Sequence, residues 1–204
     1  MAGPLYVLSG LGADERLFAP QRAARDVRGI ELVSPAPREP LAGYAARLAG
    51  TLDLPREFDL AGASFGGMIA LELARHVSPR RVYLLGSCRS PASISPMLRA
   101  LHRFAFRPPR FTHALIARYF GATSSDHVEL FSGMLAATPP AFFDWAVRAI
   151  FTWRGVAHLP MPVVHVHGDR DRLIPLARVW PDHVIAGAGH LLTLTHAAEV
   201  NALL

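Results

Sequence analysis

The sequence predicts an α/β fold in which a mostly parallel, open sheet carries helices on both faces. Short apolar runs alternate with helix-length segments whose apolar residues recur every three or four positions. Strands that alternate with helices are typical of crossover units, and these units produce parallel strands. With 204 residues, the chain is long enough to bury one full core in a single domain.

Six runs are predicted as strands because they are short, apolar and bounded by turn-forming residues. They are Leu5–Ser9, Ile30–Ser34, Phe58–Ala63, Arg81–Ser87, Val163–His167 and His183–Ala186. Three segments are predicted as helices that each lay one apolar face on the sheet, namely Leu41–Leu52, Phe65–Val77 and Leu191–Leu204. A further helix is expected after Ala13, with Asp14 as its N-terminal cap.

The strand pattern stops between the fourth and fifth predicted strands. This segment is rich in proline, arginine and aromatic residues, with helical patches at Met97–Phe106 and Ala141–Phe151. A long strand-free insertion suggests a helical lid over the carboxyl edge of the sheet, where ligands bind in this architecture. We therefore expect a core of residues 1–88 and 161–204 and a helical cap of residues 89–160.

Composition and charge exclude several classes of protein. Hydrophobic residues make up 51% of the chain and charged residues 18%, as in a compact globular protein. The net charge of +5 comes from arginine alone, and without a run of basic residues we expect no nucleic-acid partner. Cys88 is the one cysteine, and no segment is apolar for long enough to span a membrane. We expect a cytoplasmic protein.

The strongest local motif is Gly62-Ala63-Ser64-Phe65-Gly66-Gly67, which stands between a predicted strand and a predicted helix. A serine with small residues two positions before and two after it is typical of a nucleophile elbow. The backbone N–H of Phe65 would lie near the helix N-terminus, where partial positive charge favours a developing oxyanion. A glycine-rich turn in which Ser64 only caps a helix would look similar, but the flanking strand and helix favour the nucleophile.

Two further motifs follow predicted strands. The run at Val163 ends in Gly168-Asp169-Arg170-Asp171, and Ala186-Gly187-Ala188-Gly189-His190 places a histidine on a glycine-rich loop. A serine hydroxyl is a weak nucleophile until an imidazole takes its proton, and the imidazole needs a carboxylate to fix its tautomer. The order serine, acid, histidine therefore indicates Ser64 as nucleophile and His190 as base.

With these motifs in that order, nearly the whole chain resembles the α/β-hydrolase superfamily, in its small esterase-like form. In that family the acid commonly stands three residues after the glycine that ends its strand, which selects Asp171 over Asp169. The segment Ser9-Gly10-Leu11-Gly12 resembles the family's oxyanion loop, with Ser9 where histidine is usual, and this implies the Leu11 N–H as second oxyanion donor.

The resemblance implies cleavage of a carboxylic ester or thioester through an acyl-enzyme on Ser64. The substrate would be a small acyl compound, and neither a cofactor nor a metal would be needed.

Three alternatives remain open. His165, His167 and Asp169 superficially match the ligands of a metal-dependent hydrolase, because residues two apart on a strand face the same way. The fold could also be a catalytically silent scaffold that binds a ligand or a protein. The third alternative is Cys88 as the nucleophile. It ends a predicted strand but lacks a glycine-flanked turn, so it is better interpreted as a small core residue.

The first part of the predicted cap carries arginines and aromatic residues and no acidic side chain. The members are Arg89, Arg99, Arg103, Arg107, Arg110 and Arg118, with Phe104, Phe106, Phe111, Tyr119 and Phe120. They suit an apolar acyl chain with a remote anionic group or a phosphopantetheine-type carrier. Alternatively, the arginines face water while the aromatic residues seat the cap on the core. Arg16 is a further candidate for a substrate contact.

Overall fold

A computed structural model describes residues 3–101 and 108–204 of the chain. Within these residues, six parallel strands form one sheet in the order β2-β1-β3-β4-β5-β6. The strands are β1 (Leu5–Leu8), β2 (Val27–Gly29), β3 (Asp59–Ala63), β4 (Val82–Leu85), β5 (Val163–Gly168) and β6 (His183–Ile185). The parallel sheet confirms the predicted α/β class.

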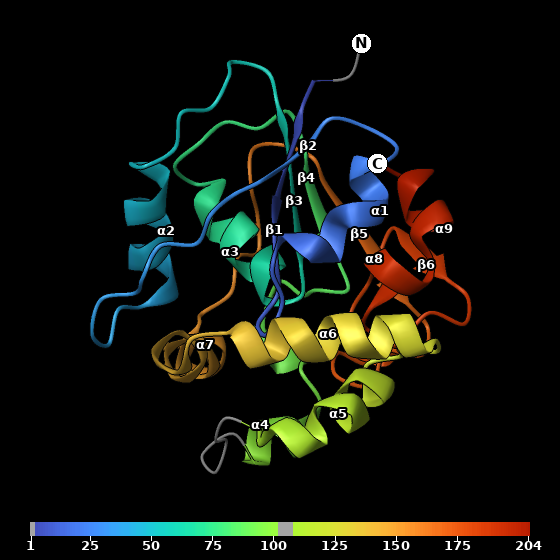
Figure 1. Cartoon of the computed structure of the whole chain (residues 1–204). Helices are drawn as coiled ribbons and strands as arrows, with labels where there is room; N and C mark the ends of the chain where they lie inside the picture. Colours follow the sequence, from blue (N-terminus) through green and yellow to red (C-terminus); the bar gives the residue numbers. More distant parts are fainter. Residues whose placement is uncertain (1–2, 102–107) are drawn as a thin grey trace.

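Helices cover both faces of the sheet (Figure 1). On one face lie α2 (Leu41–Ala49) and α3 (Phe65–Leu73). On the other lie α1 (Ala19–Arg22), α8 (Leu192–Thr195) and α9 (Ala197–Asn201). Because all strands run in the same direction, the loops that follow β1, β3, β5 and β6 meet at one edge of the sheet.

The second predicted strand was wrong in position. Instead of Ile30–Ser34, the strand is β2, which pairs with β1 and ends at Gly29. The Ile30 N–H still donates to the Val7 carbonyl at 2.9 Å, but the chain then leaves the sheet before Pro35. Ile30 is buried, and Leu32 and Val33 pack against the core from a loop. The apolar run therefore reflects burial without strand pairing.

The last predicted helix was also wrong in continuity, because two short helices, α8 and α9, occupy its place. His196 separates them with a backbone of φ −132° and ψ 46°, which is outside the helical region. The expected cap at Asp14 is present: its carboxylate accepts a hydrogen bond from the Arg16 N–H at 3.0 Å, at the start of a 3-10 helix, Glu15–Phe18.

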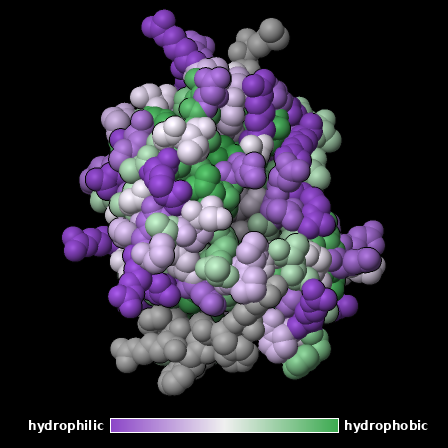
Figure 2. Space-filling model, turned by 60° about the vertical axis from the view of Figure 1, so that its left-hand side comes forward, coloured by the Kyte–Doolittle hydropathy of each residue, from purple (hydrophilic) through white to green (hydrophobic). Residues whose placement is uncertain are grey.

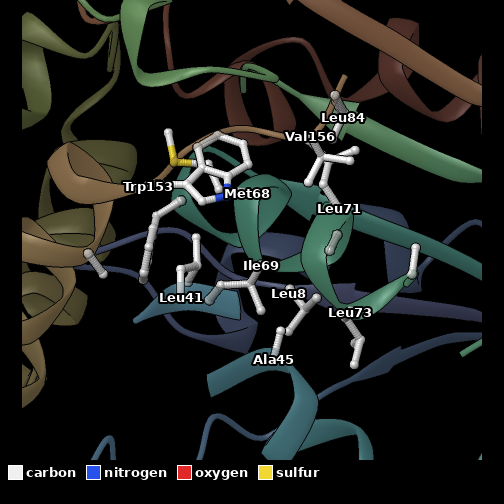
Figure 3. Packing of buried hydrophobic residues seen from close by; sticks show 14 of the residues in the cluster. Leu8, Leu41, Ala45, Met68, Ile69, Leu71, Leu73, Leu84, Trp153 and Val156 are labelled. Atoms are coloured by element: carbon white, nitrogen blue, oxygen red, sulfur yellow. The ribbon is translucent and has the colours of Figure 1, made fainter. Parts of the chain in front are cut away.

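Apolar side chains form one buried cluster on each face of the sheet. Figure 3 shows the cluster around α3, where Ile69 lies close to Leu8 of β1 and Leu41 of α2. All nine residues of α3 are buried, because the helix is enclosed by the sheet, α2 and the segment that contains Trp153. Burying one such aliphatic side chain contributes about 1.5–3 kcal/mol to folding.

Helices between β4 and β5 lie beyond the carboxyl ends of the strands (Figure 1). We call residues 89–160 the cap. Its described helices are α4 (Pro96–Leu101), α5 (His113–Tyr119), α6 (Ser125–Ala137) and α7 (Pro140–Thr152). The predicted patch at residues 141–151 lies within α7. Of the patch at residues 97–106, the part from 102 on lies outside the described residues.

After α7 the chain returns along α3 to the start of β5. The indole N–H of Trp153 donates to the Glu72 carboxylate on α3 at 2.7 Å, in a fully buried contact. The Val156 N–H donates to the carbonyl of Arg89 at 2.9 Å, which ties the end of the cap to its beginning. The cap is thus fastened to α3, the helix that follows Ser64.

Hydrophilic residues predominate on the face shown in Figure 2, with hydrophobic residues in patches between them. Among the helices of the described residues, none has the length and apolar character needed to cross a membrane.

Candidate active site

Ser64 occupies the sharp turn between β3 and α3. Its backbone has φ 52° and ψ −121°, a conformation that non-glycine residues rarely adopt. Such strain costs on the order of 1–3 kcal/mol and persists only where the surroundings enforce it. The Ser64 N–H donates to the Leu85 carbonyl at 3.0 Å, and the Ser64 carbonyl accepts from the Ser87 hydroxyl at 2.6 Å. These contacts hold the turn.

The two predicted glycines of this turn are sterically required. A Cβ atom at Gly62 would overlap the backbone carbonyl of Gly66, and a Cβ atom at Gly66 would overlap the backbone of Leu8 in β1. Only glycine therefore lets β3, α3 and β1 approach one another this closely. The predicted reason for the small residues on either side of Ser64 is confirmed.

The structure brings Ser64, His190 and Asp171 into hydrogen-bond contact at the carboxyl edge of the sheet. The Ser64 Oγ lies 2.8 Å from His190 Nε2, and His190 Nδ1 lies 2.7 Å from Asp171 Oδ2. His190 stands on the loop before α8, and Asp171 follows β5. Because an ionised carboxylate only accepts hydrogen bonds, His190 Nδ1 carries the ring proton and Nε2 can accept the serine proton.

The Asp171 carboxylate is held by its own turn. Its Oδ1 accepts the backbone N–H groups of Leu173 at 2.8 Å and Ile174 at 2.9 Å. Burial by itself raises the pKa of Asp171, but the attraction and hydrogen bond of His190, with the Ile174 N–H and the nearby His167, outweigh burial, so the pKa lies below its ordinary value. Asp171 is therefore ionised at neutral pH, as an orienting carboxylate must be.

Asp169, the other candidate acid, points elsewhere. Its Oδ1 accepts the backbone N–H of Gly187 at 2.7 Å, which braces the loop that leads to His190. The proposed metal ligands His165 and His167 bind one another, with Nε2 of the first 3.2 Å from Nδ1 of the second. Across residues 3–101 and 108–204, no three histidine, cysteine or acidic side chains converge in a way that could hold a metal ion.

Cys88 is a poor nucleophile in this structure. Its side chain is fully buried, and burial raises the pKa of the thiol to about 12. The reactive thiolate is therefore almost absent at neutral pH.

The residues of the two predicted oxyanion donors, Leu11 and Phe65, lie near Ser64. Leu11 lines the same cavity as Ser64, and its neighbour Gly10 packs so closely that an added Cβ would lie 3.1 Å from the Ser64 Cβ. Phe65 is the first residue of α3. Within the described part of the chain, neither the Leu11 N–H nor the Phe65 N–H donates to a protein acceptor. Both remain available to a substrate oxygen, and their role stays a prediction.

Ser64 and His190 open into a cavity of about 960 Å³ between the sheet edge and the cap. Apolar side chains line most of it: Leu11, Leu17, Phe65, Met68, Ile94, Leu98, Leu115, Ile116, Phe131, Leu135, Phe143, Val147, Ile150 and Phe151. Arg118 and Arg172 also line it, and both are exposed. The Arg172 guanidinium lies 5.7 Å from the centre of the Tyr119 ring. Cavities of this size hold drug-sized ligands.

The cap arginines differ in position. Arg118 lines the cavity, while Arg103 and Arg107 lie outside the described residues. Arg16, the further candidate for a substrate contact, does not line the cavity and forms an ion pair with Asp14 at 2.6 Å. Among the ion pairs of the described residues, none involves Arg118 or Arg172.

Sequence reasoning missed that the cap braces the histidine loop. The ring of Phe120 meets the His190 ring edge-on, with centres 5.3 Å apart, and the Phe120 carbonyl accepts the Leu191 N–H at 3.0 Å. Gly121 and Gly189 touch backbone to backbone, since a Cβ at either would meet the other's Cα at 2.9 Å. In the sequence, Phe120 was one aromatic residue among several in the cap, and no spacing set it apart.

A second cavity, of about 970 Å³, lies between residues 29–38 and helices α6 and α7. It shares Ala13 with the first cavity, but neither Ser64 nor His190 lines it. The candidate chemistry therefore belongs to the first cavity.

Comparisons with known proteins place the chain among enzymes with similar architecture. The sequence profile of the alpha/beta hydrolase family matches residues 3–203. A 2-hydroxymuconate semialdehyde hydrolase from a Pseudomonas species is 30% identical over 193 residues, which cover 81% of this chain and 66% of that protein. The chain thus spans just under two thirds of this relative's length.

Two solved structures are similar over almost all of the chain. An esterase from Exiguobacterium antarcticum has a TM-score of 0.79 at 15% identity, and the match covers 99% of this chain and 90% of the esterase. A meta-cleavage product hydrolase from Pseudomonas fluorescens has a TM-score of 0.73 at 17% identity, covering 99% and 89%. At these identities the likeness shows a shared fold.

Proposed function

Since the chain belongs to the alpha/beta hydrolase family, we propose that it is a serine hydrolase that cleaves a carboxylic ester or thioester. The observation that carries this proposal is the unbroken series of contacts from Ser64 through His190 to Asp171, which opens into an apolar cavity. A nucleophile, a base and an orienting acid within hydrogen-bond distance are what acyl transfer to serine requires.

The proposed reaction has two halves. The Ser64 Oγ attacks the substrate carbonyl while His190 Nε2 takes the hydroxyl proton, and Asp171 stabilises the resulting imidazolium. The Leu11 and Phe65 N–H groups hold the negative oxygen of the tetrahedral intermediate. His190 then gives its proton to the departing alcohol or thiol, which leaves an acyl-enzyme. Water repeats the sequence on the acyl-enzyme and releases the carboxylic acid.

The cavity favours an apolar acyl group. Most of the residues that line it have hydrocarbon side chains, so an aliphatic or aromatic acyl chain is desolvated there at little cost. An anionic group on such a chain or on its carrier would pair with Arg118 or Arg172, which line the same cavity.

A second candidate reaction is hydrolysis of a carbon–carbon bond next to a carbonyl. The observation that favours it is the relative that is named a 2-hydroxymuconate semialdehyde hydrolase. The same three side chains and the same cavity would serve this reaction, so only the substrate distinguishes the two candidates.

Labelling with a fluorophosphonate probe tests the proposed nucleophile. We expect the wild-type protein to be labelled and Ser64→Ala to be unlabelled, because the probe reacts only with an activated serine. Ser132→Ala is the matched control, since the Ser132 hydroxyl is buried without a hydrogen-bond partner in the described structure and its loss leaves nothing unpaired. Equal labelling of wild type and Ser64→Ala, or no labelling of either, would overturn the proposal and favour a silent scaffold.

A substrate panel distinguishes the reactions. It would contain p-nitrophenyl esters of increasing acyl length, acyl thioesters, esters with a terminal carboxylate, and a diketone that is cleaved at a carbon–carbon bond. We expect kcat/KM to rise with acyl length in both ester and thioester series. If short neutral esters were the best substrates, the anionic-group proposal would fail, and preference for the diketone would establish the second candidate.

A further inference from the structure

The histidine pair on β5, His165 and His167, has no part in the mechanism proposed above, yet it lies close to the Asp171 carboxylate. His167 is fully buried, and His165 is 5% exposed. Both side chains lie on the same side of β5, just before the turn that carries Asp171. Their rings meet edge-to-face with centres 5.1 Å apart. Buried polar side chains at such a position need partners, and the partners show what the pair does.

His167 holds the turn that fixes the position of the Asp171 carboxylate. Its Nε2 lies 2.7 Å from the carbonyl oxygen of Ile174 and 3.5 Å from Asp171 Oδ2. The N–H of the same residue, Ile174, donates to Asp171 Oδ1. The backbone of Ile174 is therefore held at two points. Its N–H donates to the Asp171 carboxylate, and its carbonyl accepts from the His167 imidazole. A carboxylate in such a turn cannot rotate without breaking these bonds.

The partners also fix the proton position in the His167 ring. A carbonyl oxygen only accepts hydrogen bonds, so His167 Nε2 must carry a proton. Burial lowers the pKa of His167. Burial and the neighbouring His167 ring together lower the pKa of His165 to about 4. Both rings are therefore neutral at pH 7. His167 Nδ1 is then an acceptor, and the His165 Nε2 atom, 3.2 Å away, can donate to it. The Ser87 backbone also hydrogen-bonds the His165 ring and competes for its single proton. A proton on His165 Nε2 favours the tautomer of His167 that holds Ile174.

We propose that His167 is a positioning residue that fixes the Asp171 carboxylate against His190, and that His165 supports it by fixing its tautomer. The inference rests on the proposed function for its kinetic consequence, but its structural consequence does not. His167 does not line the cavity, so it acts through Asp171 and not on the substrate. The pair extends the series of contacts from Ser64 to the interior of the sheet.

Two substitutions at His167 test whether its hydrogen-bond donor to Ile174 matters, because one keeps a donor and the other removes it. Glutamine places an amide N–H near the position of Nε2, whereas phenylalanine fills the space with no donor. We expect His167→Phe to lower kcat about tenfold and to change KM by a smaller factor, because a displaced acid slows proton transfer directly, whereas Ile174 is only one of the many apolar residues that line the cavity. His167→Gln should recover most of the loss. For His165, leucine should give a smaller loss, and glutamine should match the wild type.

Proton NMR gives a readout that needs no activity. The proton between His190 Nδ1 and Asp171 resonates far downfield when it is held in a short hydrogen bond. We expect this resonance to shift upfield and exchange faster in His167→Phe, and to return in His167→Gln. Tyr83→Phe is the control for lost stability, because its hydroxyl bonds the backbone of Leu204 and contacts Arg81, far from the acid, and the resonance should be unchanged.

The outcomes are decisive in either direction. If His167→Phe keeps the downfield resonance and kcat of the wild type, or if Tyr83→Phe changes them equally, His167 is only structural and the proposal is overturned. If His167→Phe fails to fold, His165→Leu tests the same contact series, and an unchanged resonance in that variant also overturns it. A wild type that shows the resonance but takes no fluorophosphonate label would refute the proposed function alone.

Discussion

The buried histidine His165 predicts a specific dependence of stability on pH. The pKa of His165 is lowered from 6.5 to about 4, first by burial and then by the neighbouring His167. In the unfolded chain the ring takes up a proton near pH 6.5, whereas in the folded protein it remains neutral until about pH 4. The unfolded state therefore binds more protons between these values, and stability must fall as the pH falls from 6.5 to 4.

The magnitude follows from the size of the shift. One pKa unit is equivalent to about 1.4 kcal/mol, so a drop from 6.5 to about 4 corresponds to about 3 kcal/mol of folding free energy. His165 is nearly fully buried, so solvent screens little of this contribution. The loss is a large share of a typical domain stability of about 5–15 kcal/mol.

The assay is urea unfolding of the wild type and of His165→Gln at pH 7 and near pH 4. Glutamine does not titrate, and its amide can still donate to His167 Nδ1. We expect the wild type to lose about 3 kcal/mol more than the variant between the two pH values. Equal losses in the two proteins would show that His165 is charged in the folded state or is solvated, and the reasoning would fail.

Two other substitutions and one thiol-labelling experiment test separate features. Gly66→Ala should lower the free energy of unfolding by more than about 3 kcal/mol, or prevent folding, because its Cβ would overlap the backbone of Leu8; thermal denaturation measures this, and a stable variant would contradict the tight crossing. The Cys88 thiol, whose pKa burial raises to about 12, should react with a disulfide reagent only after unfolding, so rapid reaction of the native protein would contradict its burial. Trp153→Phe should lower the free energy of unfolding by about 2 kcal/mol, because Oε1 of the buried Glu72 carboxylate loses its donor while Oε2 keeps the Arg75 guanidinium at 3.3 Å. Urea unfolding measures this, and a change below about 0.5 kcal/mol would be the contrary result.

The sequence predicted the sheet well, because parallel strands that are buried on both faces are marked by short apolar runs. It failed at Ile30, where apolar residues pack against the core from a loop, since burial leaves the same pattern in a strand and in a loop. It also failed at His196, because the last segment keeps its apolar spacing across a break in the backbone. Neither error moved a candidate residue of the site.

The site was only partly predictable. Ser64 could be found because its turn needs glycines at fixed positions, and that need is visible in the sequence. The choice between Asp169 and Asp171 depended on resemblance to a family, because two aspartates two residues apart look alike until their partners are seen. The roles of Ser87, Phe120 and the histidine pair depend on contacts between distant segments, which no local pattern encodes.

The path of the chain through the cap limits how this protein could be engineered. β4 ends on the side of the sheet where the carboxyl ends of the strands and the site lie. Its parallel neighbour β5 begins on the opposite side, so the cap and the segment that follows α7 are the only covalent connection between these two central strands. A segment designed to replace the cap would have to connect the end of β4 to the start of β5 and also cover the cavity. Shortening the protein to a lidless hydrolase would require a redesigned linker with its own anchor on α3, in place of the one that Trp153 now provides.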